Sequence, residues 1–398
     1  MKHSWSVQAF RLMVWMVCVA GMIQGLLIPL LTMLLEEKGV HAGTNGLSAS
    51  ALYIGMLIAS PLGPVVIRRF GVKKTILLGT SIVMVATSFF PVFSGFWVWT
   101  GLRLIVGIGD SFMHYATQLW ITMNAPGEER GRRISQYGFA YGLGFGIGPL
   151  GLNLLAFGQA VPFLAALSIL AVSFYLATRL KLAATSDELK ESEVEKGHTR
   201  LGKVYRLGFI AFCSPLIYGL LETALTGNFP IVGLREGIEK SWISIFISAF
   251  VWGSLLFQVP LGVFGDKIGR KNLLLIVCSL GSLGMFLIPL FLSNVLYLFV
   301  SFMLIGGLVG SLFSLGLAFA ADLLPSRLLP VANVIASVHF SIGSIIGPYT
   351  GGHLIEKAGG NALFVLIGCV LAGYVLMIVL EKIVNRPKPI GNKDRQAV

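Results

Sequence analysis

Twelve long apolar runs, separated by short polar segments, make up most of this chain. Each run holds about 20 residues or more, the length that an α-helix needs to cross roughly 30 Å of hydrocarbon. A transmembrane β-barrel would instead show short segments of alternating polarity. The pattern therefore predicts an all-α membrane protein with spans at 11–35, 47–66, 73–93, 97–122, 134–156, 161–180, 205–234, 242–265, 272–292, 296–321, 330–355 and 362–383.

The composition supports this prediction and excludes several classes of protein. Apolar residues make up 55% of the 398 residues and charged residues 12%, roughly half the charged share of a soluble domain. These values exclude an ordinary soluble enzyme, a disordered chain and a disulfide-stapled secreted domain. The four cysteines lie singly within apolar runs, so their spacing indicates no metal or redox site.

The basic residues are distributed unevenly between the two sides of the predicted membrane. Of the 30 Lys and Arg, 25 fall in one alternating set of polar segments, which includes both chain ends, and four fall in the other set. Basic segments stay on the cytoplasmic side of a membrane. We therefore expect a multi-pass protein of the cell membrane with both termini in the cytoplasm. The net charge of +12 reflects this topology, and no nucleic-acid partner is indicated.

The two halves of the chain repeat each other at a shift of about 199 residues. The pattern G-x-x-x-G-P-x-x-G begins at Gly144 and occurs again from Gly343. Gly21 and Gln24 match Gly219 and Glu222 in the same way. Internal repeats of this kind are one design of transporters, with a site between the halves. We expect a six-helix bundle at 1–182, a polar cytoplasmic linker at 183–204 and a second six-helix bundle with a short tail at 205–398.

The turn after the eighth span reads GVFGDKIGRK at 262–271 and fits the loop signature G-x-x-x-D-[RK]-x-G-[RK]-[RK]. With its repeated halves, the chain resembles the major facilitator superfamily over essentially its full length. The R-x-x-x-G-x-G pattern from Arg103 and the motif of span five are similar to those of the twelve-span drug–proton antiporters. The resemblance implies two pseudo-symmetric bundles that alternate access, driven by a proton gradient without a bound cofactor.

The resemblance also implies a gate on the cytoplasmic side. In the family the loop acid, here Asp266, helps to hold that side closed together with nearby basic groups. In the first half Arg68 stands at the position of the acid, which reverses the charge there. The residues expected to form the gate are Gly262, Asp266, Gly269, Arg270, Arg132 and Arg133.

Ionisable side chains within the spans are few. Placing one at mid-membrane costs about 2.5–3.5 kcal/mol of insertion free energy, so such residues usually have a function. Asp110 and Glu222 are the acids well inside spans, and Arg103 is the deeply placed base. Arg103, Asp110 and His114 share one helical face with Gly107 and Gln118. We expect Asp110, Glu222, Arg103 and His114 to couple transport to protons; a neutral packed network that only fixes helix positions is the alternative.

Repeat symmetry places Glu222 and Gln24 near the axis between the two halves. Removal from water disfavours the charged form of a carboxylate, so Glu222 can exchange a proton for a cationic substrate. Other polar or aromatic groups in or beside the spans are candidates for the substrate cavity, although a lone histidine such as His339 is more often satisfied by packing. The cavity candidates are Gln24, Tyr137, Tyr141, Asn228, Gln258, Asn333 and His339.

Glycines and prolines in spans five and eleven predict close helix packing and bending. The residues concerned are Gly144, Gly148, Pro149, Gly347 and Pro348.

The function that we expect is proton-coupled efflux of small apolar or cationic compounds by a monomeric carrier in the lipid bilayer. A proton-coupled carrier of a metabolite, sugar or lipid, working in either direction, shares the fold and remains an alternative. A non-transporting sensor is a further alternative. The chain has no motif of a hydrolase or metalloprotease and no P-loop, so we expect neither an enzyme nor a primary pump.

Overall fold

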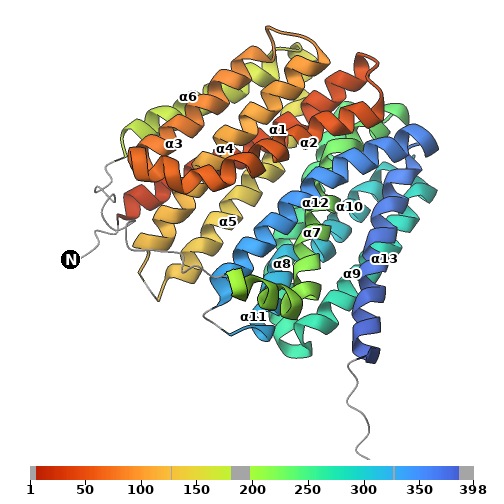
Figure 1. Ribbon diagram of the computed structural model, residues 1–398. Coiled ribbons are helices and arrows are strands. Elements are labelled where there is room, and N and C mark those ends of the chain that lie inside the picture. Colours follow the sequence, from red (N-terminus) through yellow and green to blue (C-terminus); the bar gives the residue numbers. More distant parts are fainter. Residues whose placement is uncertain (1–5, 127, 181–197, 326–327, 385–398) are drawn as a thin grey trace, which may run out of the picture.

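The computed structural model describes residues 6–126, 128–180, 198–325 and 328–384. Throughout these ranges the regular structure is helical. Figure 1 shows two groups of helices side by side, one running from red to yellow-green and one from green to blue. The helices of the first half are α1 Val7–Glu37, α2 Ala42–Ala59, α3 Gly63–Phe89, α4 Phe96–Asn124, α5 Arg130–Ile147 and α6 Val161–Thr178, with short 3₁₀ segments η1 Ser60–Leu62 and η2 Gly148–Phe157.

The second half repeats this succession of elements. Its helices are α7 His198–Arg235, α8 Lys240–Ile268, α9 Arg270–Leu287, α10 Val295–Val309, α11 Leu312–Leu323, α12 Leu329–Ala358 and α13 Asn361–Val384, with the 3₁₀ segment η4 Ile288–Phe291 after α9. Helix α7 begins at His198, inside the linker expected at 183–204, because the helical conformation continues into the polar sequence before the span. Residues 181–197 of that linker lie outside the described residues.

The helices supply the twelve predicted spans. Within the described ranges, ten segments are long and apolar enough to cross a membrane, and one of them, residues 42–89, is 48 residues long and holds two crossings. Helix α4 is 29 residues long and supplies a further span despite its polar stripe. Helices α10 and α11 form one span, residues 295–323. The all-α architecture of two six-helix bundles is thus confirmed.

Two glycines at matching places in the repeat reverse the chain after the second and the eighth span. Gly71 has a φ of 78° and Gly269 a φ of 85°, a region that residues with a side chain rarely adopt. Each glycine stands within a basic turn, with Lys73 following the first and Arg270 the second. The repeat in sequence is therefore also a repeat in backbone conformation.

The expected close approach of span five to a neighbouring helix is present. A Cβ atom on Gly144 of α5 would lie 1.9 Å from the carbonyl oxygen of Cys18 in α1. In the second half, a Cβ atom on Gly343 of α12 would lie 2.0 Å from the carbonyl oxygen of Leu216 in α7. Glycine is thus required at both crossings.

The two prolines of the repeat have different effects. At Gly148 helix α5 gives way to the 3₁₀ segment η2, with Pro149 at its start, because proline cannot donate the next helical hydrogen bond. Helix α12 instead continues through Pro348. The bending role expected of these residues stays a prediction.

At one face of the molecule the two bundles are joined by ion pairs, and we call this the sealed face. Arg235 at the end of α7 donates from Nε to Glu36 Oε1 of α1 at 2.7 Å. Its Nη2 lies 3.5 Å from Glu356 Oε2 of α12. Glu356 in turn accepts a hydrogen bond from the Ala42 amide of α2 at 2.9 Å. Charged groups of both bundles therefore hold this face together.

Beneath these ion pairs, α2 and α12 touch backbone to backbone, and Figure 1 shows the two helices lying close together. A Cβ atom on Gly46 would lie 2.1 Å from the Pro348 carbonyl oxygen. The Ser50 hydroxyl donates to the Ile345 carbonyl oxygen at 2.7 Å. No room is left for water to pass between the helices at these points.

The opposite face carries the basic turns, the N-terminal end of α1 and the C-terminal end of α13. We call it the basic face. Here a cavity of about 1120 Å³ opens between the bundles. Its wall combines apolar side chains with several arginines and one acid. The lining residues that matter below are Arg11, Arg132, Arg133, Phe139, Leu143, Gln258, Val259, Gly262, Asp266 and Arg270.

Candidate functional site

Arg103 is buried in the first bundle, where it ties three helices together. Its side chain donates to Ser48 Oγ of α2 at 3.1 Å, and to Ile28 O and Thr32 Oγ1 of α1 at 3.2 Å each. All three acceptors are neutral. Arg103 and Asp110 share a face of α4, but the guanidinium group is bonded to α1 and α2, and no acid pairs with it among the described residues.

Asp110 and His114 lie one turn apart and face each other. The Nε2 atom of His114 is 3.8 Å from Oδ1 of Asp110, and the Asp110 side chain is 4% exposed. Within the described part of the chain, Asp110 Oδ2 and His114 Nε2 have no hydrogen-bond partner. The pair is therefore close enough to share a proton after a small movement and has no competing partner for it.

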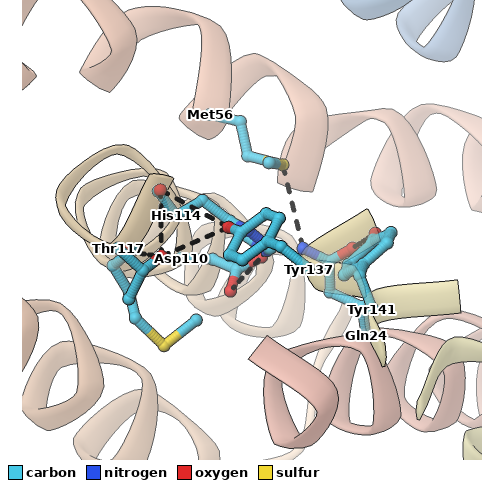
Figure 2. A network of polar contacts seen from close by, with 8 residues as sticks. Gln24, Met56, Asp110, His114, Thr117, Tyr137 and Tyr141 are labelled. Carbon is cyan, nitrogen blue, oxygen red and sulfur yellow. Dashed lines mark hydrogen bonds and ion pairs between the residues drawn. The ribbon is translucent and has the colours of Figure 1, made fainter. Parts of the chain in front are cut away.

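Tyr137 is bonded to the other side of the His114 ring, and Thr117 is bonded to Tyr137. The Nδ1 atom of His114 is 2.7 Å from the Tyr137 hydroxyl of α5, which lies 3.2 Å from Thr117 Oγ1. Thr117 donates to the Met113 carbonyl oxygen at 2.8 Å. Figure 2 shows Tyr137 lying across the histidine and the threonine, with Asp110 on the other side of the ring. Tyr137 thus belongs to the proton-site candidates in space, although the sequence suggested the cavity wall.

Gln24 and Tyr141 form a second polar pair beside the first. The Tyr141 hydroxyl donates to Gln24 Oε1 at 2.6 Å, and Gln24 Nε2 lies 4.0 Å from Met56 Sδ. In Figure 2 this pair stands next to the Asp110 group without a direct bond to it. Gln24 is buried, and its amide links α1, α2 and α5.

Glu222 of α7 lies on the second bundle at the seam between the halves. It accepts a hydrogen bond from the Tyr218 hydroxyl at 2.8 Å, and it is only partly buried. Glu222 also lies within electrostatic reach of Tyr53 and Tyr141 of the first bundle. Repeat symmetry predicted a place near the axis, and the acid does face the other bundle there.

The remaining cavity candidates are dispersed. Gln258 lines the cavity of the basic face. Asn228 is buried and donates to the Pro348 carbonyl oxygen at 3.1 Å, within the second bundle. His339 donates from Nδ1 to the Ile335 carbonyl oxygen of its own helix at 2.9 Å, as expected of a histidine satisfied by packing. Asn333 is exposed and does not line the cavity.

The expected gate residues stand on the two sides of the open cavity. Asp266 Oδ1 accepts from Arg270 Nη2 at 3.0 Å, and Arg270 also binds Asp322. Across the cavity, Arg133 pairs with Glu129, the residue directly before α5, at 2.6 Å. A pairing of Asp266 with Arg132 or Arg133 in the closed state stays a prediction.

Sequence reasoning missed several residues of the site. Tyr218 lies one turn before Glu222, and this spacing was available as a signal. Tyr53 and Ser48 stand in an ordinary run of span two, where nothing marks them. No group of three His, Cys, Asp or Glu that would hold a metal occurs in the described ranges.

The family follows from comparison with known proteins. The model of the Major Facilitator Superfamily matches residues 13–235 and again 207–397, two overlapping matches that together cover nearly the whole chain. This chain belongs to the major facilitator superfamily. The MFS-type transporter YfkF of Bacillus subtilis (strain 168) is 37% identical over 374 residues, covering 94% of this chain and 95% of YfkF. YcaD of Escherichia coli O6:K15:H31 (strain 536 / UPEC), also an MFS-type transporter, is 24% identical over 90% of this chain and 91% of YcaD.

Solved structures of superfamily members have the same fold. A mutant of the nucleoside transporter NupG superposes with a TM-score of 0.76 at 14% identity, covering 95% of this chain and 99% of NupG. A D-xylose–proton symporter superposes with a TM-score of 0.72 at 15% identity, covering 94% of this chain and 96% of the symporter. The protein is thus a multi-pass secondary transporter for a small molecule.

Proposed function

We propose that this superfamily member is a proton-coupled antiporter that exports small apolar or cationic compounds. The observation that carries the proposal is Glu222, a carboxylate partly exposed at the seam between the bundles and bonded only by Tyr218 among the described residues. A carboxylate held away from water is costly in its charged form unless a cation or a proton accompanies it. A cationic substrate and a proton therefore compete for the same oxygen atoms.

Aromatic rings near this acid support a cationic or apolar substrate. Tyr53 and Tyr141 of the first bundle lie within electrostatic reach of Glu222, and Tyr218 of its own helix is bonded to it. The face of an aromatic ring attracts a cation and also buries apolar surface. A sugar or another neutral polar compound would leave the charge of Glu222 uncompensated.

Alternating access supplies the transport step. The basic face is the cytoplasmic face by the positive-inside rule, so the present conformation is inward-open. Its cavity of about 1120 Å³ is larger than most drug-sized pockets, which hold about 300–1,000 Å³. Phe139, Leu143 and Val259 give its wall an apolar character suited to amphipathic compounds. The cavity would receive substrate from the cytoplasm, and the sealed face would open to release it.

Asp110 and His114 are the proposed site of the coupling proton in the first bundle. Asp110 is 3% exposed, so its charge changes inside a packed bundle. A change of charge there alters the equilibrium between the inward-open and the outward-open conformation. A buried charge raises the free energy most in the conformation that hydrates it least.

A flux assay in proteoliposomes with an imposed pH gradient tests this proposal. The probes are ethidium as a monovalent organic cation, and D-xylose and uridine as neutral polar compounds. We expect ethidium to move against the proton gradient in exchange, and to dissipate the gradient as it moves. Movement of D-xylose or uridine together with protons, and no movement of ethidium, would establish the alternative of a metabolite symporter.

A further inference from the structure

We propose that Arg11 and Arg132, in the wall of the cavity on the basic face, bind the phosphate group of an anionic membrane lipid. The acyl chains of this lipid lie along apolar side chains of the same wall. The site goes beyond the proposed function, because binding of the lipid neither requires nor excludes the exchange of a cation for a proton at Glu222.

The first bundle supplies one wall of the cavity, where the N-terminal ends of α1 and α5 meet. The guanidinium group of Arg133 in α5 lies over the ring of Phe10 in α1, 5.0 Å from the ring centroid. Arg11 follows Phe10 in the sequence, Arg132 precedes Arg133, and all four residues line the cavity. The contact between Phe10 and Arg133 therefore brings two further guanidinium groups to this wall.

Two of the four arginines that line the cavity are neutralised within the protein. Arg133 pairs with Glu129 at 2.6 Å. Arg270 pairs with Asp266 at 3.0 Å and also with Asp322. These two guanidinium groups already have carboxylate partners, so an added anion gains little from them.

The other two arginines, Arg11 and Arg132, are not neutralised in this way. Both side chains are exposed, and within the ranges that the structure describes neither has a hydrogen-bond or ion-pair partner. Gln136 lines the cavity beside them, and its Oε1 atom accepts from Arg133 Nη1 at 3.1 Å, so its amide N–H groups can donate to a ligand. Guanidinium forks bind phosphate oxygens with charge-assisted hydrogen bonds. A phosphate group therefore fits this wall in both charge and hydrogen bonding.

Apolar side chains beside the arginines favour a lipid over inorganic phosphate. Val7 and Val14 of α1 and Phe139 of α5 line the same cavity. Val7 is 48% exposed and Phe139 is 52% exposed. Inorganic phosphate gains nothing from such a surface, whereas an acyl chain removes it from water. The basic face also lies at the cytoplasmic leaflet, whose anionic lipids attract basic residues near the membrane surface.

A bound lipid phosphate has a consequence for a cation that enters the cavity. The uncompensated guanidinium groups of Arg11 and Arg132 repel such a cation, and an anion bound to them removes this repulsion. The lipid site is therefore compatible with a cationic substrate, although the wall of the cavity carries four arginines and one acid.

Lipid binding to the purified protein in a non-ionic detergent tests the proposal. The probe is phosphatidylglycerol with a fluorescent label on one acyl chain, and its anisotropy reports binding. We expect saturable binding to the wild type. Arg11→Gln and Arg132→Gln are each expected to weaken it about 5-fold, the effect of one basic residue at an anionic lipid surface. Unchanged affinity in either variant would overturn the proposal.

Arg69→Gln is the matched control, since it makes the same change of charge in a basic turn outside the cavity wall. It is expected to leave the affinity for the labelled lipid unchanged. An equal loss of affinity in this control would show a general effect of the basic face and would overturn the assignment to the cavity.

Unlabelled competitors distinguish a lipid from inorganic phosphate. Phosphatidylglycerol is expected to displace the probe, and phosphatidylcholine, whose headgroup carries a compensating cation, to do so at least about 5-fold less effectively. Inorganic phosphate at the same concentration is expected to displace none. Equal displacement by phosphatidylcholine or by inorganic phosphate would overturn the proposal. Because the assay needs no transported compound, it can fail while ethidium is exchanged for protons, or succeed while ethidium does not move.

Discussion

The contact between α2 and α12 at the sealed face gives the sharpest mechanical prediction. A Cβ atom on Gly46 would lie 2.1 Å from the Pro348 carbonyl oxygen, whereas ordinary contacts lie at 3.4–4 Å. In Gly46→Ala the two helices must therefore part by about 1 Å or more. Overpacking of this kind costs about 1–3 kcal/mol. The contact exists only when the sealed face is closed, so the cost falls on this conformation alone.

A cost of that size changes the ratio of the two conformations by about 5–150-fold. The change is measured by maleimide labelling of single cysteines in a protein whose four native cysteines are replaced. Ser50→Cys reports the sealed face, because Ser50 is buried there. Gln258→Cys reports the cavity of the basic face. In Gly46→Ala we expect labelling at position 50 to rise at least about 5-fold and labelling at position 258 to fall.

Gly101→Ala is the matched control. Gly101 lies in α4 of the same bundle, and a Cβ atom there would meet nothing within 4 Å. It is expected to leave both labelling rates unchanged. Equal rates in Gly46→Ala and the control, at equal thermal stability, would refute the idea that this contact holds the sealed face closed.

Three further predictions concern the charged groups. Arg103→Lys keeps the charge but loses bonds to neutral acceptors, so we expect a lower melting temperature by calorimetry and an unchanged pH dependence of transport. The Ala42 amide, as the main cause, lowers the pKa of Glu356 below its ordinary value of 4.5. The charged carboxylate of Glu356 therefore stabilises the sealed face above pH 4.5, and this stabilisation is lost as the pH falls through the lowered pKa. Acid below pH 4 should therefore raise labelling at the sealed face, and Glu356→Gln should abolish this response. Asp266→Asn should raise labelling at position 258, because the acid contributes to closing the basic face; equal labelling would count against a gate role.

The architecture could be predicted from the sequence because a membrane span is recognised by its local composition. Length and hydropathy predict twelve spans, and the repeated motifs predict two similar bundles, the glycine crossings and the place of Glu222. These features depend on spacing along one helix or on the match between the halves. The start of α7 was not predicted, since a polar sequence can remain helical beyond the membrane.

The details of the site were less accessible because they depend on which helices meet. The partners of Arg103 are neutral groups of other spans, and no pattern marks Ser48 or Thr32 as acceptors. The ion pair of Glu36 with Arg235 joins two helix ends that lie 199 positions apart, and charges at helix ends carry no spacing signal. Tyr137 was expected in the cavity wall because aromatic residues beside a span suit a substrate. Its hydroxyl instead lies 2.7 Å from His114 Nδ1 of α4.

Competition between a proton and a cation at Glu222 is the central claim, and proton release tests it most directly. Purified protein in weakly buffered detergent is mixed with ethidium, and a pH indicator reports the protons set free. The account predicts release of a proton for each ethidium bound by the wild type, and none from Glu222→Gln. Equal release from Glu222→Gln, or ethidium binding to the wild type without release of protons, would contradict it.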